Sequence, residues 1–187
     1  MGRSGAKNAY LCSCFQTTGF YKTESTENRA IKYMRFLGNV DCKTDAKGRV
    51  FLPAVFRKVL QASGGETMML RKDIFQPCLV LYPESVWNEM EDTLRRRLNK
   101  FNAQHQQIFR QFVEGAEMVT LDGNGRLLIP KRYMDMAFIR QDVRFIGMDD
   151  TIEIWSCDKM EETRLSNEDF SKALETILGQ ETTPADI

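Results

Sequence analysis

Apolar positions along this chain recur with two different periods, and each period predicts a different kind of element. Residues 36–44 and 49–52 have the composition of two strands joined by a polar turn. Three- and four-residue spacings then predict a helix that ends before two consecutive glycines, with an apolar stripe of Val55, Phe56, Val59 and Leu60. Strands are expected next at 67–71 and 78–82. The first part of the chain should therefore fold as a β-hairpin, a helix and a second β-hairpin.

Longer helical patterns occupy the middle and the end of the chain. After Pro83, apolar residues three or four positions apart predict a helix whose apolar face, made of Trp87, Met90, Leu94, Leu98 and Phe101, packs in the core or in a subunit interface. A second helix is expected at 103–113. The residues 166–169, SNED, are typical of a helix N-terminus, because the serine side chain can accept a hydrogen bond from a free backbone N–H group. This last helix should continue to about Leu178, and residues 181–187 should form a frayed tail.

One ten-residue motif occurs twice. The sequence TDAKGRVFLP at 44–53 returns as LDGNGRLLIP at 121–130, and equivalent positions lie 77 residues apart. The strand that ends at Tyr82 also has a counterpart, which ends at Trp155. Each half is too small to close a sheet or to bury both of its faces alone. We therefore predict an α+β fold in which two tandem repeats pair about a pseudo-twofold axis and share one barrel-like core.

Both copies of the motif carry the residues of a tight turn. Asp45 and Asp122 begin the turn and can accept backbone hydrogen bonds, whereas Gly48 and Gly125 end it and tolerate a positive φ angle. The proline that closes each copy suits the first turn of a helix, because its missing N–H would be unpaired there. The two turns should therefore have the same geometry, and each should lead into a helix.

The arginine that follows each glycine, Arg49 or Arg126, has two interpretations. It can pair with an acidic neighbour on the adjoining strand, which would be a structural role. Alternatively, the two arginines lie at corresponding hairpin tips, with Lys43 and Lys47 beside the first, and two basic tips at a fixed distance suit a DNA duplex. Because Asn124 stands where the first motif has Lys47, the two tips should contribute unequally to DNA affinity.

Composition narrows the possible functions. The 187 residues include 26 basic and 26 acidic side chains, so any binding of nucleic acid must use a local patch and not a basic field over the whole surface. No apolar run is long enough to span a membrane, and the N-terminus has no signal-peptide pattern. One histidine and five irregularly spaced cysteines supply neither a metal cluster nor a nucleophile with its base. We therefore expect a cytoplasmic protein with reduced thiols, and neither an enzyme nor a protein with a metal or cofactor.

The sequence also suggests how the chain is divided. Residues 1–33 show no periodicity, so we expect a disordered extension, with Met34 as a possible natural start and a genuine flexible arm as the alternative. The remaining segments are expected to be a first repeat at 34–83, linking helices at 84–113, a second repeat at 114–157, and a C-terminal helix with an acidic tail at 158–187.

The three consecutive arginines 95–97 suggest another nucleic-acid contact. Glu91 and Asp92 stand four residues before the first two of them, which favours ordinary ion pairs along a helix. A DNA contact by these arginines is the alternative.

The stretch from Met34 to about Leu165 resembles the MraZ family of bacterial transcriptional regulators, within the AbrB/SpoVT-like swapped-hairpin superfamily. The resemblance is carried by the two Asp-x-x-x-Arg motifs, each followed by an aliphatic residue and a proline. It is also carried by QPCLVLYP at 76–83 with Trp87, and by IEIW at 152–155. One Asp-x-x-x-Arg motif alone is common by chance, whereas two at this separation and in this context are specific.

The resemblance implies a swapped-hairpin or double-split β-barrel and a DNA-binding regulator that forms ring-shaped homo-oligomers. Such regulators bind tandem direct repeats upstream of their own operon, and a repressor of the cell-division and cell-wall gene cluster, associated with the nucleoid, is implied. The family's arginines correspond to Arg49 and Arg126, and Lys47 keeps the basic character of the first motif. Thr44 and the 33-residue leader depart from the family's pattern. A swapped-hairpin module that binds a protein partner, as antitoxin-like relatives do, is the alternative function.

Overall fold

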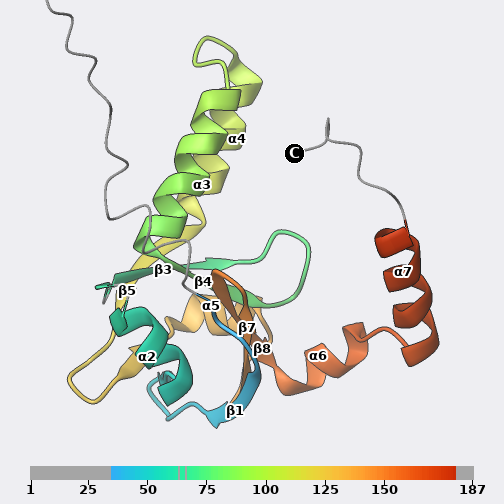
Figure 1. Ribbon diagram of the computed structural model, residues 1–187. Helices are drawn as coiled ribbons and strands as arrows, with labels where there is room; N and C mark the ends of the chain where they lie inside the picture. Colours follow the sequence, from blue (N-terminus) through green and yellow to red (C-terminus); the bar gives the residue numbers. More distant parts are fainter. Residues whose placement is uncertain (1–34, 63, 66, 180–187) are drawn as a thin grey trace, which may run out of the picture.

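The computed structural model describes residues 35–62, 64–65 and 67–179 (Figure 1). The expectations for the leader, for Met34 as the start and for the tail at 181–187 lie outside these described residues. The strands are β1 (Asn39–Lys43), β2 (Arg49–Phe51), β3 (Thr67–Lys72), β4 (Leu79–Pro83), β5 (Ala116–Thr120), β6 (Arg126–Leu128), β7 (Asp142–Met148) and β8 (Thr151–Ser156). The helices are α2 (Ala54–Ala62), α3 (Glu84–Arg97), α4 (Ala103–Glu114), α5 (Lys131–Met136), α6 (Cys157–Thr163) and α7 (Asn167–Gly179).

The strands form two antiparallel sheets. One sheet has six strands in the order β1-β7-β8-β4-β3-β5, and the other consists of β2 and β6 alone. Each sheet therefore contains strands from both halves of the chain. The helices α3 and α4 lie side by side and project from the sheet, whereas α6 and α7 extend away on another side (Figure 1). This arrangement confirms the α+β class with mainly antiparallel pairing.

The expected pairing inside the first hairpin is wrong. β1 pairs with β7 and β2 pairs with β6, so the two strands on either side of the first turn lie in different sheets. Leu52 continues this exchange, because its backbone N–H donates to the carbonyl of Gly125 in the second half at 3.1 Å. The exchange buries Val50 and Leu127 almost completely, which a hairpin closed on itself in a half this small could not do. The later hairpins, β3 with β4 and β7 with β8, form as expected.

One core holds the two halves together. Its side chains come from both sheets and from α2, and burial of this apolar surface is the main stabilising term for such a fold. The largest fully buried side chains are Phe36, Phe56, Phe145, Leu52, Leu60, Met68, Leu70, Leu79, Leu81, Leu127, Ile129 and Ile152. Because residues of both repeats belong to this one cluster, neither repeat has a core of its own.

The helical pair packs through aromatic rings at its base. Trp87 on α3 stacks on Phe112 of α4, with ring centroids 5.0 Å apart, and it also meets Tyr82 of β4 edge-on at 5.6 Å. The predicted apolar stripe extends too far, because α3 ends at Arg97 and Phe101 is 98% exposed in the following turn. His105 of α4 joins this turn to the helix, since its Nδ1 accepts a hydrogen bond from the Asn99 N–H at 2.9 Å.

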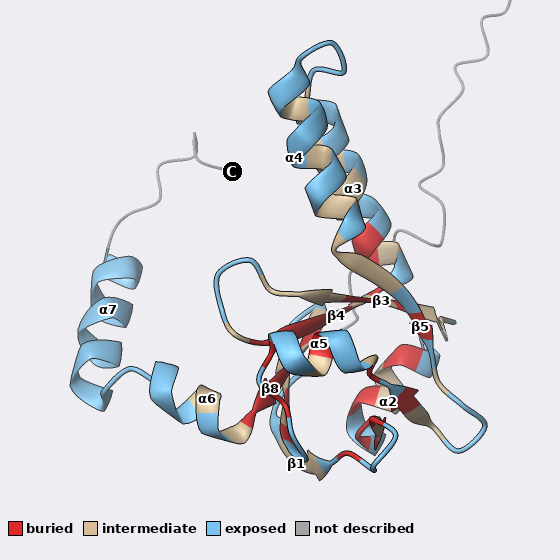
Figure 2. Ribbon diagram, turned by 180° about the vertical axis from the view of Figure 1, so that it is seen from behind, coloured by how far each residue is buried: buried red, intermediate tan, exposed pale blue. Residues whose placement is uncertain are grey.

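The C-terminal region contains two helices where the sequence predicted one. Arg144 on β7 connects Asp41 of β1 with Glu161 of α6, at 2.5 and 3.0 Å. The predicted cap of α7 is confirmed, because the N–H of Asp169 donates to the Ser166 hydroxyl at 3.1 Å. All residues of α7 are exposed, as its pale blue ribbon in Figure 2 shows. Its large exposed apolar residues are Phe170, Leu174, Ile177 and Leu178.

Candidate nucleic-acid interface

The first Asp-x-x-x-Arg turn is organised by its aspartate. The Asp45 carboxylate accepts the backbone N–H groups of Lys47 and Arg49 on Oδ1, both at 2.9 Å. Its other oxygen, Oδ2, accepts Nε and Nη2 of the Arg49 side chain, both at 2.6 Å. The backbone closes the turn as well, because the N–H of Gly48 donates to the Asp45 carbonyl at 2.9 Å. One carboxylate therefore fixes both the turn and the direction of its arginine.

The second turn repeats these contacts atom for atom. Oδ1 of Asp122 accepts the N–H groups of Asn124 and Arg126 at 2.9 Å, and Oδ2 accepts Nε and Nη2 of Arg126 at 2.8 and 2.7 Å. The N–H of Gly125 donates to the Asp122 carbonyl at 2.8 Å. The expected equivalence of the two turns is confirmed.

The aspartates are held in their charged form by these contacts. Donation from the Arg49 side chain, then from its backbone N–H, lowers the pKa of Asp45 to about 2. The pKa of Asp122 is lowered as well, first by the backbone N–H of Arg126 and then by its side chain. The structural interpretation of the arginines is therefore right that each pairs with an acid, but the acid belongs to the same turn and not to the adjoining strand.

Both turns favour glycine because of a positive φ angle, and the first turn also lacks room beside the backbone for a Cβ. Gly48 and Gly125 have φ angles of +82° and +76°, a region that residues with a Cβ rarely adopt. Space is also missing, because a Cβ on Gly48 would lie 2.7 Å from the carbonyl oxygen of Ile129 and 3.1 Å from Sδ of Met134. A Cβ on Gly125 would collide with the guanidinium of Arg57 on α2.

A local twofold axis relates the two turns. Val50 and Leu127 are equivalent positions 77 residues apart, and they are also direct partners in the β2–β6 register. The hydrogen bonds around them are reciprocal, because the N–H of Leu52 donates to Gly125 at 3.1 Å and the N–H of Ile129 donates to Gly48 at 2.9 Å. The pairing therefore sets the two arginines on neighbouring strands in a fixed relation.

Two apolar side chains lie exposed on this strand pair. Phe51 is 55% exposed and Leu128 is 53% exposed, and they occupy equivalent positions of the two repeats. Phe51 is the register partner of Arg126, whose guanidinium lies 5.9 Å from the centre of its ring. Such rings can also pack against sugar and base edges in a DNA groove. Nothing in the sequence distinguished these two residues from core positions of a strand.

The predicted lysines lie in different surroundings. Lys47 is exposed within the first turn, and its ammonium group forms no ion pair with a residue that the structure describes. Lys43 stands at the end of β1, and its Nζ lies 3.4 Å from a carboxylate oxygen of Asp142. Both side chains lie close to the first turn along the chain, but only Lys47 adds an uncompensated charge to it.

The three consecutive arginines belong to the helical pair. Arg95 forms the expected ion pair with Glu91 at 3.4 Å and lies over the ring of Phe109 at 4.8 Å. Arg96 donates to the Thr93 hydroxyl at 2.9 Å instead of pairing with Asp92. These contacts support the helix-surface interpretation for both residues.

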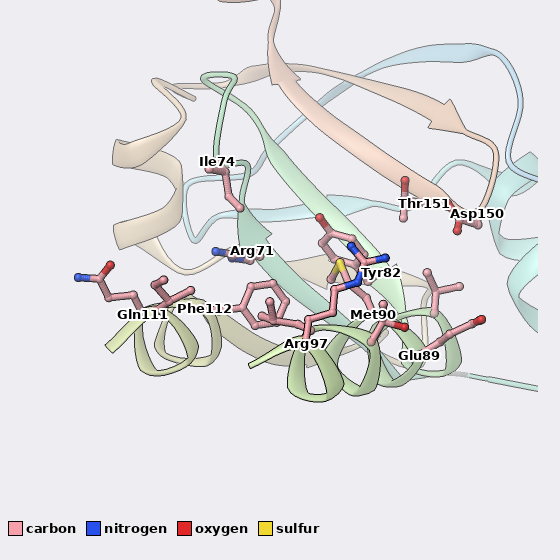
Figure 3. A pocket seen from close by; sticks show the side chains of 14 residues that line it. Arg71, Ile74, Tyr82, Glu89, Met90, Arg97, Gln111, Phe112, Asp150 and Thr151 are labelled. Atoms are coloured by element: carbon pink, nitrogen blue, oxygen red, sulfur yellow. The ribbon is translucent and has the colours of Figure 1, made fainter. Parts of the chain in front are cut away.

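A groove of about 810 Å³ lies between the helical pair and the sheet (Figure 3). It is lined by apolar and aromatic side chains such as Tyr82, Met90 and Phe112, together with the charged side chains of Arg71 and Arg97. The guanidinium of Arg71 lies 4.4 Å from the centre of the Phe112 ring. None of the residues that line this groove belongs to either Asp-x-x-x-Arg turn.

Other kinds of site have little support among the described residues. In the part of the chain that the structure describes, no three His, Cys, Asp or Glu side chains gather as a metal ion would need. Cys42, Cys78 and Cys157 are free thiols, and burial raises the pKa of the Cys78 thiol well above its usual range. None of the described helices is long and apolar enough to cross a bilayer.

Comparison with known proteins identifies the family. A family model described as "MraZ protein, putative antitoxin-like" matches the chain twice in succession, at residues 35–111 and 112–180. A protein named "Transcriptional regulator MraZ" from Phocaeicola vulgatus is 64% identical over 146 residues, which are 78% of this chain and 95% of the relative. Proteins of the same name from Bacteroides thetaiotaomicron (58% identical, 79% of this chain and 95% of the relative) and Clostridium tetani (35%, 76% and 96%) also match. The resemblance seen in the sequence is confirmed, and the chain belongs to the MraZ family with two tandem MraZ repeats.

Proposed function

We propose that this protein is a sequence-specific DNA-binding transcriptional regulator that contacts DNA through its two Asp-x-x-x-Arg turns. The observation that carries the proposal is the local twofold between the turns, which holds Arg49 and Arg126 in a fixed relation on neighbouring strands. Two basic groups at a constant separation can follow the sugar-phosphate backbone along a groove. The names of the relatives support the regulatory role.

The ion pairs inside the turns are compatible with DNA contact. In Arg49, Nε and Nη2 both donate to a single oxygen of Asp45, and the same holds for Arg126 with Asp122. A guanidinium has five N–H donors, so each arginine keeps donors for a phosphate or a base. The aspartate restricts the motion of the arginine before DNA arrives, which lowers the entropy cost of binding.

We further propose that the protein acts as a ring-shaped homo-oligomer on tandem direct repeats. A single chain presents few uncompensated cations, so its own affinity at physiological salt should be low. The exposed apolar residues of α7 and the apolar groove beside α3 and α4 are surfaces that further copies of the chain could cover. Linked copies turn successive DNA contacts into intramolecular ones, which can raise avidity by roughly 10² to 10⁴.

The expected target lies upstream of the protein's own operon, within the cell-division and cell-wall gene cluster, and repression is the proposed effect. A cytoplasmic, nucleoid-associated location follows from such a role. The exchange of β2 and β6 between the halves also supports a swapped-hairpin barrel as the architecture.

The decisive experiment is retardation of DNA from that upstream region, divided into fragments with one, two and three candidate repeats and measured over a range of salt concentrations. We expect affinity to rise steeply with repeat number. Arg49→Ala should weaken binding to the longest fragment by roughly 10²-fold or more, because each ring contains many copies of the lost contact. Arg110→Ala on the exposed side of α4 is the matched control.

Sizing of each variant shows whether the oligomer is intact. Wild-type affinity that ignores repeat number would contradict the ring proposal. Normal binding by Arg49→Ala would contradict the role of the turns.

A protein-interaction module is the second candidate, favoured by the antitoxin-like description of the family. It predicts no salt-dependent binding to any upstream fragment. The same retardation experiment therefore separates the two functions.

A further inference from the structure

Arg57 is a cation that the sequence did not associate with either turn. It belongs to α2, just after the first Asp-x-x-x-Arg motif, yet its side chain crosses to the second turn. A Cβ built on Gly125 would collide with Nη1 of Arg57 and would lie 3.0 Å from its Cδ. The guanidinium and the end of its stem therefore lie directly on the backbone of the second turn.

The guanidinium of Arg57 has no counter-charge among the described residues. Its Nε is buried and lacks a hydrogen-bond acceptor there. Its terminal nitrogens also form no hydrogen bond with a described residue, and they are not buried. Arg49 and Arg126, by contrast, are each paired with an aspartate. A partly buried arginine without an acid is unusual, and the approach of an anionic oxygen to its terminal nitrogens would stabilise it.

The position of Arg57 changes the charge balance between the turns. The first turn contains one acid and two cations, Lys47 and Arg49, whereas the second contains one acid and only Arg126. The expectation that the two tips contribute unequally to DNA affinity considered these side chains alone. With Arg57 added to the second turn, the two tips carry the same formal charge.

We propose that Arg57 binds a DNA phosphate at the second turn, with its terminal nitrogens as donors beside Arg126. Its buried Nε and the packing of its Cδ against the second turn fix the direction of the group, and the terminal nitrogens carry a charge that no described residue compensates. Arg57 thus supplies at the second turn the positive charge that Lys47 supplies at the first. This proposal rests on the DNA-binding function proposed above.

The twofold provides a matched substitution for the test. Met134 on α5 is the counterpart of Arg57 at the 77-residue offset, and its Sδ packs on Gly48 as Arg57 packs on Gly125. Arg57→Met therefore places on the second turn a side chain that already packs on the first. The variant should keep its thermal unfolding midpoint and its oligomer size while losing one cation per subunit.

The measurement is affinity for a repeat-containing duplex and for an unrelated duplex over a range of salt concentrations. We expect Arg57→Met to reduce the magnitude of the slope of log affinity against log salt by about 0.9 for each bound subunit. Affinity should fall by roughly tenfold per contact, and equally on both duplexes, because a phosphate contact carries no sequence information. Arg110→Met on α4 should leave the slope unchanged. Met134→Arg, which adds the cation to the first turn, should make the slope steeper by a similar amount.

The outcomes separate this proposal from the function on which it rests. Wild-type protein that binds neither duplex overturns both. Wild-type protein that binds, with an unchanged slope for a folded Arg57→Met, overturns the phosphate contact alone and leaves Arg57 a packing residue. A loss of affinity for the repeat-containing duplex alone overturns the phosphate contact and indicates that Arg57 contacts a base. If Arg57→Met does not fold, Met134→Arg decides, and a slope equal to that of the wild type then overturns the proposal.

Discussion

Replacing Asp45 by alanine gives opposite results under two simple views of the first turn. If the turn acts only through its charge, removing a carboxylate raises the formal charge from +1 to +2 and should strengthen DNA binding. If the carboxylate positions Arg49, its loss should weaken binding although the protein becomes more basic. The structure favours the second result, because Asp45 accepts two backbone N–H groups and two guanidinium nitrogens.

The size of each effect can be bounded. One additional uncompensated cation near the backbone adds at most about 0.9 to the magnitude of the salt slope, which matters least at high salt. A released arginine regains up to about 2 kcal/mol of rotamer entropy that must be lost again on binding, and this corresponds to roughly 30-fold in affinity. We therefore expect Asp45→Ala to bind about 3- to 30-fold more weakly at physiological salt, depending on how far the added charge offsets the loss, with a steeper salt dependence.

Fluorescence anisotropy with a labelled duplex at several salt concentrations measures both quantities. Asp45→Asn is the graded control, because its side-chain oxygen can still accept the two backbone N–H groups while the ion pair is lost. The double variant with Arg49→Ala should bind no more weakly than Arg49→Ala alone, since Asp45 is argued to act through that arginine. Binding by Asp45→Ala that equals or exceeds the wild type at every salt concentration would refute the positioning role.

Two further predictions concern stability. Gly48→Ala should cost roughly 3–4 kcal/mol of unfolding free energy, because both the positive φ and a backbone oxygen 2.7 Å from the new Cβ oppose it. Gly64 also has a positive φ, but its new Cβ would meet no atom within 4 Å, so Gly64→Ala should cost only about 1–2 kcal/mol. Urea unfolding of the two variants measures the difference, and equal costs would contradict the close approach seen at Gly48. The second prediction follows from the pKa of Asp45, which is lowered from 3.8 to about 2 in the folded protein. The stability gained from the charged carboxylate is therefore present above pH 3.8 and is lost as the pH falls toward 2. The difference in thermal midpoint between wild type and Asp45→Asn should therefore shrink over that pH interval and stay nearly constant above it. A difference that is undiminished at pH 2 would show that the charge is not its source.

Local chemistry made part of this structure predictable. The turns could be predicted because Asp, Gly and Arg at fixed spacing have few ways to satisfy their hydrogen bonds, and the two turns match in every such contact. The N-terminal cap of α7 at Ser166 could be predicted for the same reason. Helix ends were less predictable, since the stripe of α3 continues to Phe101 in sequence although the helix ends before it.

The partner of each strand could not be predicted from local pattern. β2 is apolar enough to pair with β1 or with β6, and only the shared core decides between them. The position of Arg57 could not be predicted either, because its contact with Gly125 exists only after β2 and β6 have paired. One signal was available in the sequence: Arg57 and Met134 differ in charge at equivalent positions beside otherwise similar motifs.

The exchange between the halves gives a physical reason for carrying the motif twice in one chain. The carbonyl of each turn's glycine accepts the N–H that follows the other turn's strand, so neither turn is complete without its counterpart. The side chain that packs on each glycine belongs to the helix after the other motif, Arg57 over the second turn and Met134 over the first. Two separate copies would have to associate before either arginine was held in place, whereas a tandem repeat makes that association intramolecular. A single chain also allows the two halves to diverge, and the exchanged arrangement places the cation that differs between them on the turn that lacks its own lysine.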